Sequence, residues 1–132
     1  MDAVLHVLRY LRGTYNQAIL YHPVDKFADT LWDWVHSDWA ADVDSRRSRT
    51  GYLVMLNGGA VSWKSRRQDF LSLSTSEAEY VAASQCGQEV YYMREILRGF
   101  GFAQTAHTQI YDDNLACVAM SENPVRASFS PH

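Results

Sequence analysis

A tight-turn sequence between two β-prone runs constrains the fold of this chain more than any other feature. Residues 52–56 are a run of large apolar side chains, and residues 60–64 follow after Asn57-Gly58-Gly59. Asn-Gly and Gly-Gly pairs accept the positive φ angles that two-residue hairpin turns require. The pattern therefore predicts an antiparallel hairpin, and the alternation in its second half predicts that Val61 and Trp63 face the core.

A long helix is predicted after the hairpin. Ser74 followed by Glu77 forms a capping box, in which the two side chains satisfy backbone donors at a helix start, and Gly99 or Gly101 is expected to end the helix. One stripe of the helix repeats at intervals of three or four residues: Glu79, Ala82, Ala83, Cys86, Val90, Met93 and Leu97. Because this stripe is apolar except at Glu79, the helix is expected to pack on the sheet.

The remaining patterns complete an α/β fold. Helices are predicted at residues 3–12 and 115–120, the second capped by Asn114. Strands are predicted at residues 18–21, 30–39 and 108–112. From residue 30 onward the predicted order is βββαβα, with three antiparallel strands at the start, a parallel strand after them, and helices flanking the mixed sheet.

Length and charge limit the classes of function. With 132 residues, 47% of them hydrophobic, the chain is expected to form one domain around one core. The formal net charge of −3 gives no overall attraction to nucleic acid, so such binding requires a local basic patch. The candidate basic residues are Arg46, Arg47, Arg49, Lys64, Arg66 and Arg67.

The cysteine count and the hydropathy of the sequence indicate in which cellular compartment the chain is expected. Cys86 and Cys117 are too few for a disulfide framework or a cysteine-based zinc site. We find no secretory signal pattern and no apolar run that approaches the roughly 20 residues needed to cross a bilayer. The expectation is a soluble intracellular protein without a membrane partner.

Acidic and imidazole groups stand at three points where predicted elements begin or end. These are His36 with Asp38, Glu79, and Asp112 with Asp113. If they converge, the carboxylates need cations to offset their repulsion, and hard oxygen ligands favour Mg²⁺ or Mn²⁺. Taken singly, each has a structural explanation as well.

Those alternatives stay open at the level of residues alone. A carboxylate at Glu79 is stabilised by the dipole of its helix start, and Asp112-Asp113 fits a capped turn. A histidine at the position of His36 fits an ordinary strand end. The arginines near Asp44 fit a solvated loop.

Four sequence blocks, spread over about residues 30–125, carry a family resemblance. They are Ser37-Asp38-Trp39-Ala40-Ala41-Asp42-Val43-Asp44-Ser45-Arg46-Arg47-Ser48 continuing into Thr50-Gly51-Tyr52, Asn57-Gly58-Gly59-Ala60-Val61-Ser62-Trp63-Lys64-Ser65-Arg66-Arg67-Gln68, Leu71-Ser72-Leu73-Ser74-Thr75-Ser76-Glu77-Ala78-Glu79-Tyr80, and Tyr111-Asp112-Asp113-Asn114 with Ser121-Glu122-Asn123-Pro124-Val125. In this order they resemble the ribonuclease H-like domain of Ty1/copia-type retrotransposon polyproteins. The resemblance implies a ribonuclease H-like fold that lacks its last elements.

Domain boundaries follow from the same resemblance. Residues 8–14 resemble the stretch that joins the reverse transcriptase to this domain, so residues 1–26 are expected to be a linker segment. Residues 27–122 are the expected ribonuclease H-like domain, and residues 123–132 a divergent or truncated tail. The implied partners are an RNA/DNA hybrid and the reverse transcriptase part of the polyprotein, in a virus-like particle in the cytoplasm or in the nucleus.

The implied activity is endonucleolytic hydrolysis of the RNA strand of an RNA/DNA hybrid by two Mg²⁺ or Mn²⁺ ions held on four acids. Glu79 and Asp113 match two of those acids as catalytic and metal-binding residues. His36 replaces the first-strand Asp, and residues 126–132 show no match to the fourth acid. Asp38 is a candidate substitute on the same strand face, whereas Asp33 has the opposite parity.

Two hypotheses follow from this incomplete match. Either the chain is a ribonuclease H-like domain with weakened metal binding and impaired activity, or it is a non-catalytic remnant of a transposon polyprotein that binds nucleic acid or has a structural role. Phosphate contacts in the second case would come from Arg46, Arg47, Lys64, Arg66 and Arg67.

Overall fold

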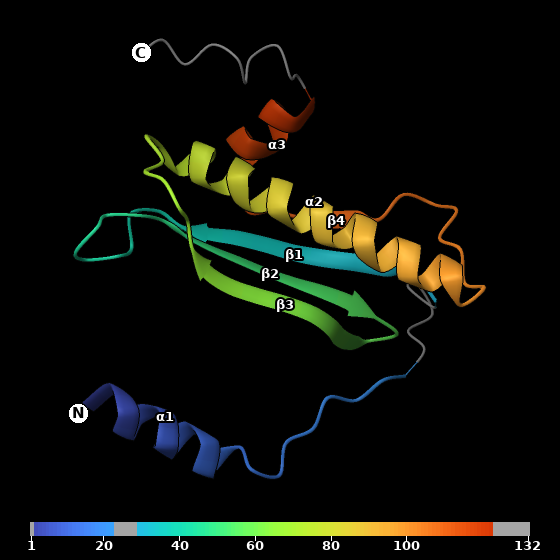
Figure 1. Ribbon diagram of the computed structural model, residues 1–132, viewed down its shortest axis with the longest axis horizontal. Coiled ribbons are helices and arrows are strands. Elements are labelled where there is room, and N and C mark those ends of the chain that lie inside the picture. The colour runs from blue at the N-terminus through green and yellow to red at the C-terminus, as the bar shows by residue number, and fades with distance from the viewer. Residues whose placement is uncertain (1, 23–28, 123–132) are drawn as a thin grey trace.

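A four-stranded mixed sheet and three helices make up the described part of the chain (Figure 1). The computed structural model describes residues 2–22 and 29–122. The elements are α1 (Asp2–Gly13), β1 (Leu31–Asp38), β2 (Arg49–Leu56), β3 (Gly59–Arg67), α2 (Thr75–Gly99), β4 (Gln109–Tyr111) and α3 (Leu115–Glu122). The predicted α/β class and the order βββαβα after residue 30 are confirmed.

The sheet has the strand order β3-β2-β1-β4. β1 and β2 pair antiparallel, as do β2 and β3, whereas β4 pairs parallel to β1. The antiparallel start and the later parallel strand are therefore as predicted. This topology is compatible with part of a ribonuclease H-like fold.

One face of the sheet is covered by α2, as Figure 1 shows. Leu31, Val35 and Val54 of the strands pack there with Ala82 and Cys86 of the helix. The predicted apolar stripe of α2 thus forms the helical half of the core. In Figure 1, α1 lies below β3, away from α2, and none of its residues is buried against the described part of the chain.

The predicted hairpin forms, but the face of one residue was predicted wrongly. Asn57 and Gly58 have φ angles of 48° and 76°, as the Asn-Gly turn requires. A register shift in the β2–β3 pairing leaves Val61 as an extra residue in β3. Such a bulge reverses the alternation beyond it, so Val61 packs against the core while Trp63 is 65% exposed.

The strand predicted at residues 18–21 is wrong, since these residues form no strand. The Tyr21 hydroxyl donates to the carbonyl oxygen of Ala60 at 2.7 Å, and the backbone N–H of His22 donates to that of Asn57 at 2.8 Å. This segment is therefore bonded to the hairpin turn instead of forming a ladder with a sheet edge.

Both predicted helix caps are confirmed. The Ser74 hydroxyl accepts the N–H of Glu77 at 3.1 Å, and the Glu77 carboxylate accepts the N–H of Leu73 at 2.6 Å. The side-chain oxygen of Asn114 accepts the N–H of Cys117 at 3.0 Å. These caps fix where α2 and α3 begin, and two candidate carboxylates lie close to those starts.

Part of the chain lies outside the described residues. The predicted tail at residues 123–132 does so entirely, and the boundary at residue 26 falls within residues 23–28, which are not described either. The domain boundaries stay predictions. Within residues 2–22 and 29–122, no helix combines the length and the apolar character needed to cross a membrane.

Candidate metal centre

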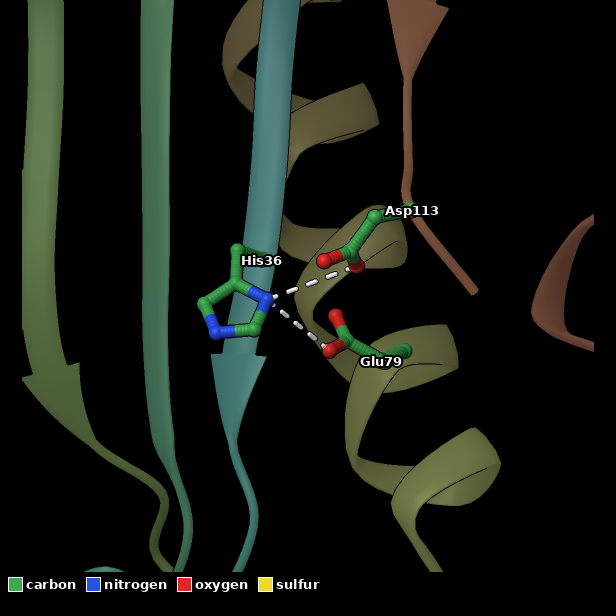
Figure 2. Close-up of side chains that lie close together, drawn as sticks. All are labelled: His36, Glu79 and Asp113. Atoms are coloured by element: carbon green, nitrogen blue, oxygen red, sulfur yellow. Dashed lines mark ion pairs between the residues drawn. The ribbon is translucent and has the colours of Figure 1, made fainter. Parts of the chain in front are cut away.

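Three of the predicted site residues meet at the end of β1. The Nδ1 atom of His36 lies 3.2 Å from a carboxylate oxygen of Glu79 and 3.5 Å from one of Asp113. All three candidate ligand atoms lie within 4.8 Å of one another. Figure 2 shows that both contacts meet at the same imidazole nitrogen. This His36–Glu79–Asp113 cluster joins β1, α2 and the residues that follow β4.

The short length of β4 explains why these elements can meet. Its pairing with β1 covers Trp32 to Trp34 and ends there. His36 lies two residues further, beyond the last β1–β4 pair. The chain leaving β4 at Asp113 and the second turn of α2 at Glu79 can therefore reach the same imidazole.

Glu79 supplies the buried acid of the cluster. It is 4% exposed, and its Oε2 atom has no hydrogen-bond partner among the described residues. Burial raises the pKa of Glu79, and Asp112 and Asp113 raise it further, while a backbone hydrogen bond from Ser37 and the charge of His36 act against this. A buried carboxylate oxygen without a partner is costly, so this position favours a bound cation or proton.

The two carboxylates beside His36 change the pKa of its imidazole. Partial burial lowers its pKa, but the charges of Glu79 and Asp113 outweigh this effect and the net pKa is raised. In the absence of a metal ion, the imidazole thus gains a proton more readily than a free histidine. The protonated ring then neutralises part of the charge of the two carboxylates.

Asp38 lies on the other side of the imidazole. Its Oδ1 atom is 3.5 Å from Nε2 of His36, and it does not belong to the three-residue cluster. The predicted shared strand face of His36 and Asp38 is confirmed by the alternating burial of β1. Asp33 has the opposite parity, as predicted, and is fully buried under α2.

Asp112 fits the capped-turn explanation better than a role in the cluster. Its Oδ1 atom accepts the N–H of Asn114 at 2.8 Å. Burial, together with Asp112, raises the pKa of the neighbouring Cys117 thiol to about 12, so that thiol is neutral near pH 7. Of the two adjacent aspartates, Asp113 is the one that faces His36.

Two of the predicted nucleic-acid contacts are held in ion pairs with acids. Arg66 lies 3.2 Å from Asp69, and Arg67 lies 3.2 Å from Asp42. The loop between β1 and β2 carries Arg46 and Arg47, and β2 begins at Arg49. Binding of phosphate by the β3 arginines would have to compete with these ion pairs.

A hollow of about 520 Å³ borders the cluster. His36, Asp113 and Lys64 line it together with Trp34 and Tyr111, whose ring centroids are 4.8 Å apart. Sequence reasoning does not single out either aromatic residue. Trp34 lies two residues before His36 in β1, so the sequence could have placed the two side chains on the same face of the strand. The place of Tyr111 depends instead on the parallel register of β4 with β1.

Fold and site together define an α/β domain with a candidate divalent-cation site of one imidazole and two carboxylates. The chain is similar to retrovirus-related Pol polyproteins. The chain is 36% identical, over 99% of its length, to the Pol polyprotein of transposon TNT 1-94 from Nicotiana tabacum. It is 32% identical, over its whole length, to the Pol polyprotein of transposon RE1 from Arabidopsis thaliana. It covers 10% and 9% of these two proteins.

A further relative carries a different name. The chain is 42% identical over 70% of its length to Secreted RxLR effector protein 161 from Plasmopara viticola, and covers 63% of that protein. No family model and no solved structure matches the chain. The similarity to Pol polyproteins over nearly the whole chain supports the prediction of a retrotransposon polyprotein segment.

Proposed function

We propose that this chain is the ribonuclease H-like domain of a retrotransposon Pol polyprotein, with an impaired site for hydrolysis of RNA in RNA/DNA hybrids. The observation that carries the proposal is the meeting of Glu79 and Asp113 at the end of β1, around His36. The strand order and the similarity to Pol polyproteins support it.

The residues present do not fit a pair of Mg²⁺ ions. Magnesium prefers an octahedron of oxygen ligands, whereas the described cluster offers two carboxylates and one imidazole. The imidazole, 3.2 Å and 3.5 Å from those acids, offers one nitrogen to a metal where a third carboxylate would offer two charged oxygens. We therefore derive no hydrolytic step through two Mg²⁺ ions.

The test is cleavage of an RNA/DNA hybrid whose RNA strand is labelled, in Mg²⁺ or Mn²⁺. We expect a rate lower than that of an intact ribonuclease H by at least about a hundredfold, since loss of one transition-state-stabilising group commonly costs that much. His36→Asp should raise the rate without reaching that of the intact enzyme, because the fourth acid has no match. Cleavage by the unaltered chain at the intact enzyme's rate would contradict the proposal.

A second candidate function is binding of nucleic acid without cleavage. The hollow beside the cluster favours it, because Trp34 in its lining is 52% exposed and can stack on a base, and Lys64 of the same lining carries a positive charge. Affinity for a hybrid should fall steeply as salt rises and survive Glu79→Gln. Binding that salt does not weaken, or no detectable binding, would count against this function.

A further inference from the structure

We infer that His36, Glu79 and Asp113 bind one divalent ion of the class that accepts imidazole nitrogen, with Zn²⁺ as its representative, in preference to Mg²⁺. This inference goes beyond the proposed function, because it requires neither binding nor cleavage of nucleic acid. It rests on the distances, the burial and the donor atoms of the cluster.

The distances fit a small tetrahedral ion. Zinc binds imidazole nitrogen and carboxylate oxygen at about 2.1 Å, which separates two ligand atoms of a tetrahedron by about 3.4 Å. Nδ1 of His36 lies 3.2 Å from the Glu79 oxygen and 3.5 Å from the Asp113 oxygen. These two edges of the tetrahedron therefore exist before any rearrangement of side chains.

Buried Glu79 is an independent indication of a ligand. Its side chain is 5% exposed, and its Oε2 atom has no hydrogen-bond partner in residues 2–22 or 29–122. α2 holds this carboxylate beside His36, almost entirely shielded from solvent. An ion on the outer side of Glu79 would satisfy a group that the described protein atoms leave unsatisfied.

Asp38 provides the support that metal-bound histidines usually have. A histidine that ligates through one nitrogen commonly donates its other N–H to a carboxylate, which fixes the ring. Here Nδ1 faces the cluster and Nε2 lies 3.5 Å from Oδ1 of Asp38. Asp38 is thus a positioning residue for the inferred site.

The charge of the cluster and its access to solvent also fit one zinc ion. Glu79 and Asp113 together offset the charge of one divalent ion, and neutral imidazole completes a set that suits zinc and its neighbours better than magnesium. The side chains of His36 and Asp113 are 57% and 76% exposed. Water can therefore take the fourth position, as in open zinc sites.

The test is titration of the untagged chain with Zn²⁺ by calorimetry, and with Co²⁺ by visible absorption. We expect one equivalent of Zn²⁺ to bind, a tetrahedral Co²⁺ spectrum, and no displacement by a large excess of Mg²⁺. His36→Ala and Asp113→Asn should abolish the spectrum, and Asp38→Asn should weaken binding by about tenfold or more.

Matched controls keep the outcome decisive. His107→Ala and Asp44→Asn remove the same groups from exposed positions outside the cluster and should leave binding unchanged. Circular dichroism checks that each variant folds. Binding that survives His36→Ala, or that Mg²⁺ displaces readily, would overturn the inference. Neither result depends on nucleic acid, so failure here is distinct from failure of the proposed function.

Discussion

Two acidic regions share β1 and α2 but lie on opposite faces of the strand. On one face, His36 meets Glu79 and Asp113 where solvent has access. On the other, Asp33 is fully buried and interacts with the Cys86 thiol of α2. Because successive residues of a strand point to opposite faces, the even-numbered His36 lies in the ligand cluster and the odd-numbered Asp33 lies in the core.

Asp33 shows what burial does without a cation nearby. Burial raises its pKa to about 7 and the charge of Glu89 adds to this, while the Cys86 thiol acts against it. Glu89 is itself held by the hydroxyls of Ser62 at 2.6 Å and Tyr52 at 3.4 Å. Below about pH 7 this carboxyl is mainly the neutral acid, whereas the acids of the outer cluster contact the imidazole of His36.

Asp33→Asn has the largest expected effect and tests the buried region. A pKa raised from 3.8 to about 7 means that the folded state holds a proton that the unfolded state has released, so stability falls as the pH rises from about 4 to about 7. At roughly 1.4 kcal/mol per pH unit, the loss is about 4 kcal/mol. The Asn variant should lack this loss and be more stable than the unaltered chain at pH 8.

Urea denaturation at pH 5 and pH 8 measures this difference. The raised pKa values of Glu79 and His36 change stability in the same direction, so the variant must be compared with the unaltered chain at each pH. An Asn variant that is less stable than the unaltered chain at pH 8 would show that charged Asp33 is well accommodated.

His36→Asp tests the outer cluster. A third carboxylate beside Glu79 and Asp113 adds repulsion and removes the compensating imidazole, which should lower the free energy of unfolding by about 1 to 2 kcal/mol in a chelator. Mn²⁺ should restore it, because an ion that binds only the folded state stabilises that state. His36→Asn, which adds no charge, is the control. A variant as stable as the unaltered chain in chelator would contradict the description of the cluster.

Ser74→Ala has the smallest expected effect and separates the two regions. The cap stabilises the first turn of α2, so its loss should cost about 1 kcal/mol. Glu79 lies one turn from this cap and Asp33 faces the middle of the helix at Cys86. We therefore expect weaker Zn²⁺ binding with an unchanged pH dependence of stability. If Zn²⁺ binding and the pH dependence of stability were both lost in this variant, the two acidic regions would not be independent.

Local patterns predicted most of the fold. The Asn-Gly turn, the capping box at Ser74 and the Asn114 cap are interactions between residues a few positions apart, and each occurs as predicted. The bulge at Val61 was not predictable in this way, because it depends on how β3 aligns with β2. For that reason Trp63 was assigned to the wrong face.

The candidate site was predictable as residues but not as geometry. Family resemblance identified Glu79 and Asp113 and marked His36 as a replacement. That Nδ1 of His36 faces both acids while Nε2 faces Asp38 depends on ring orientation and on where β4 ends, which no local pattern contains. The burial of Asp33 was implied by its parity, but its neighbour Cys86 required the packing of α2.

The most direct test of the inferred metal site is diffraction at the zinc absorption edge from crystals grown with one equivalent of Zn²⁺. The predicted result is one strong anomalous peak about 2.0 to 2.2 Å from Nδ1 of His36 and from oxygens of Glu79 and Asp113. A map with no peak at the end of β1, or with zinc only at other histidines, would contradict the claim that this cluster is a metal centre.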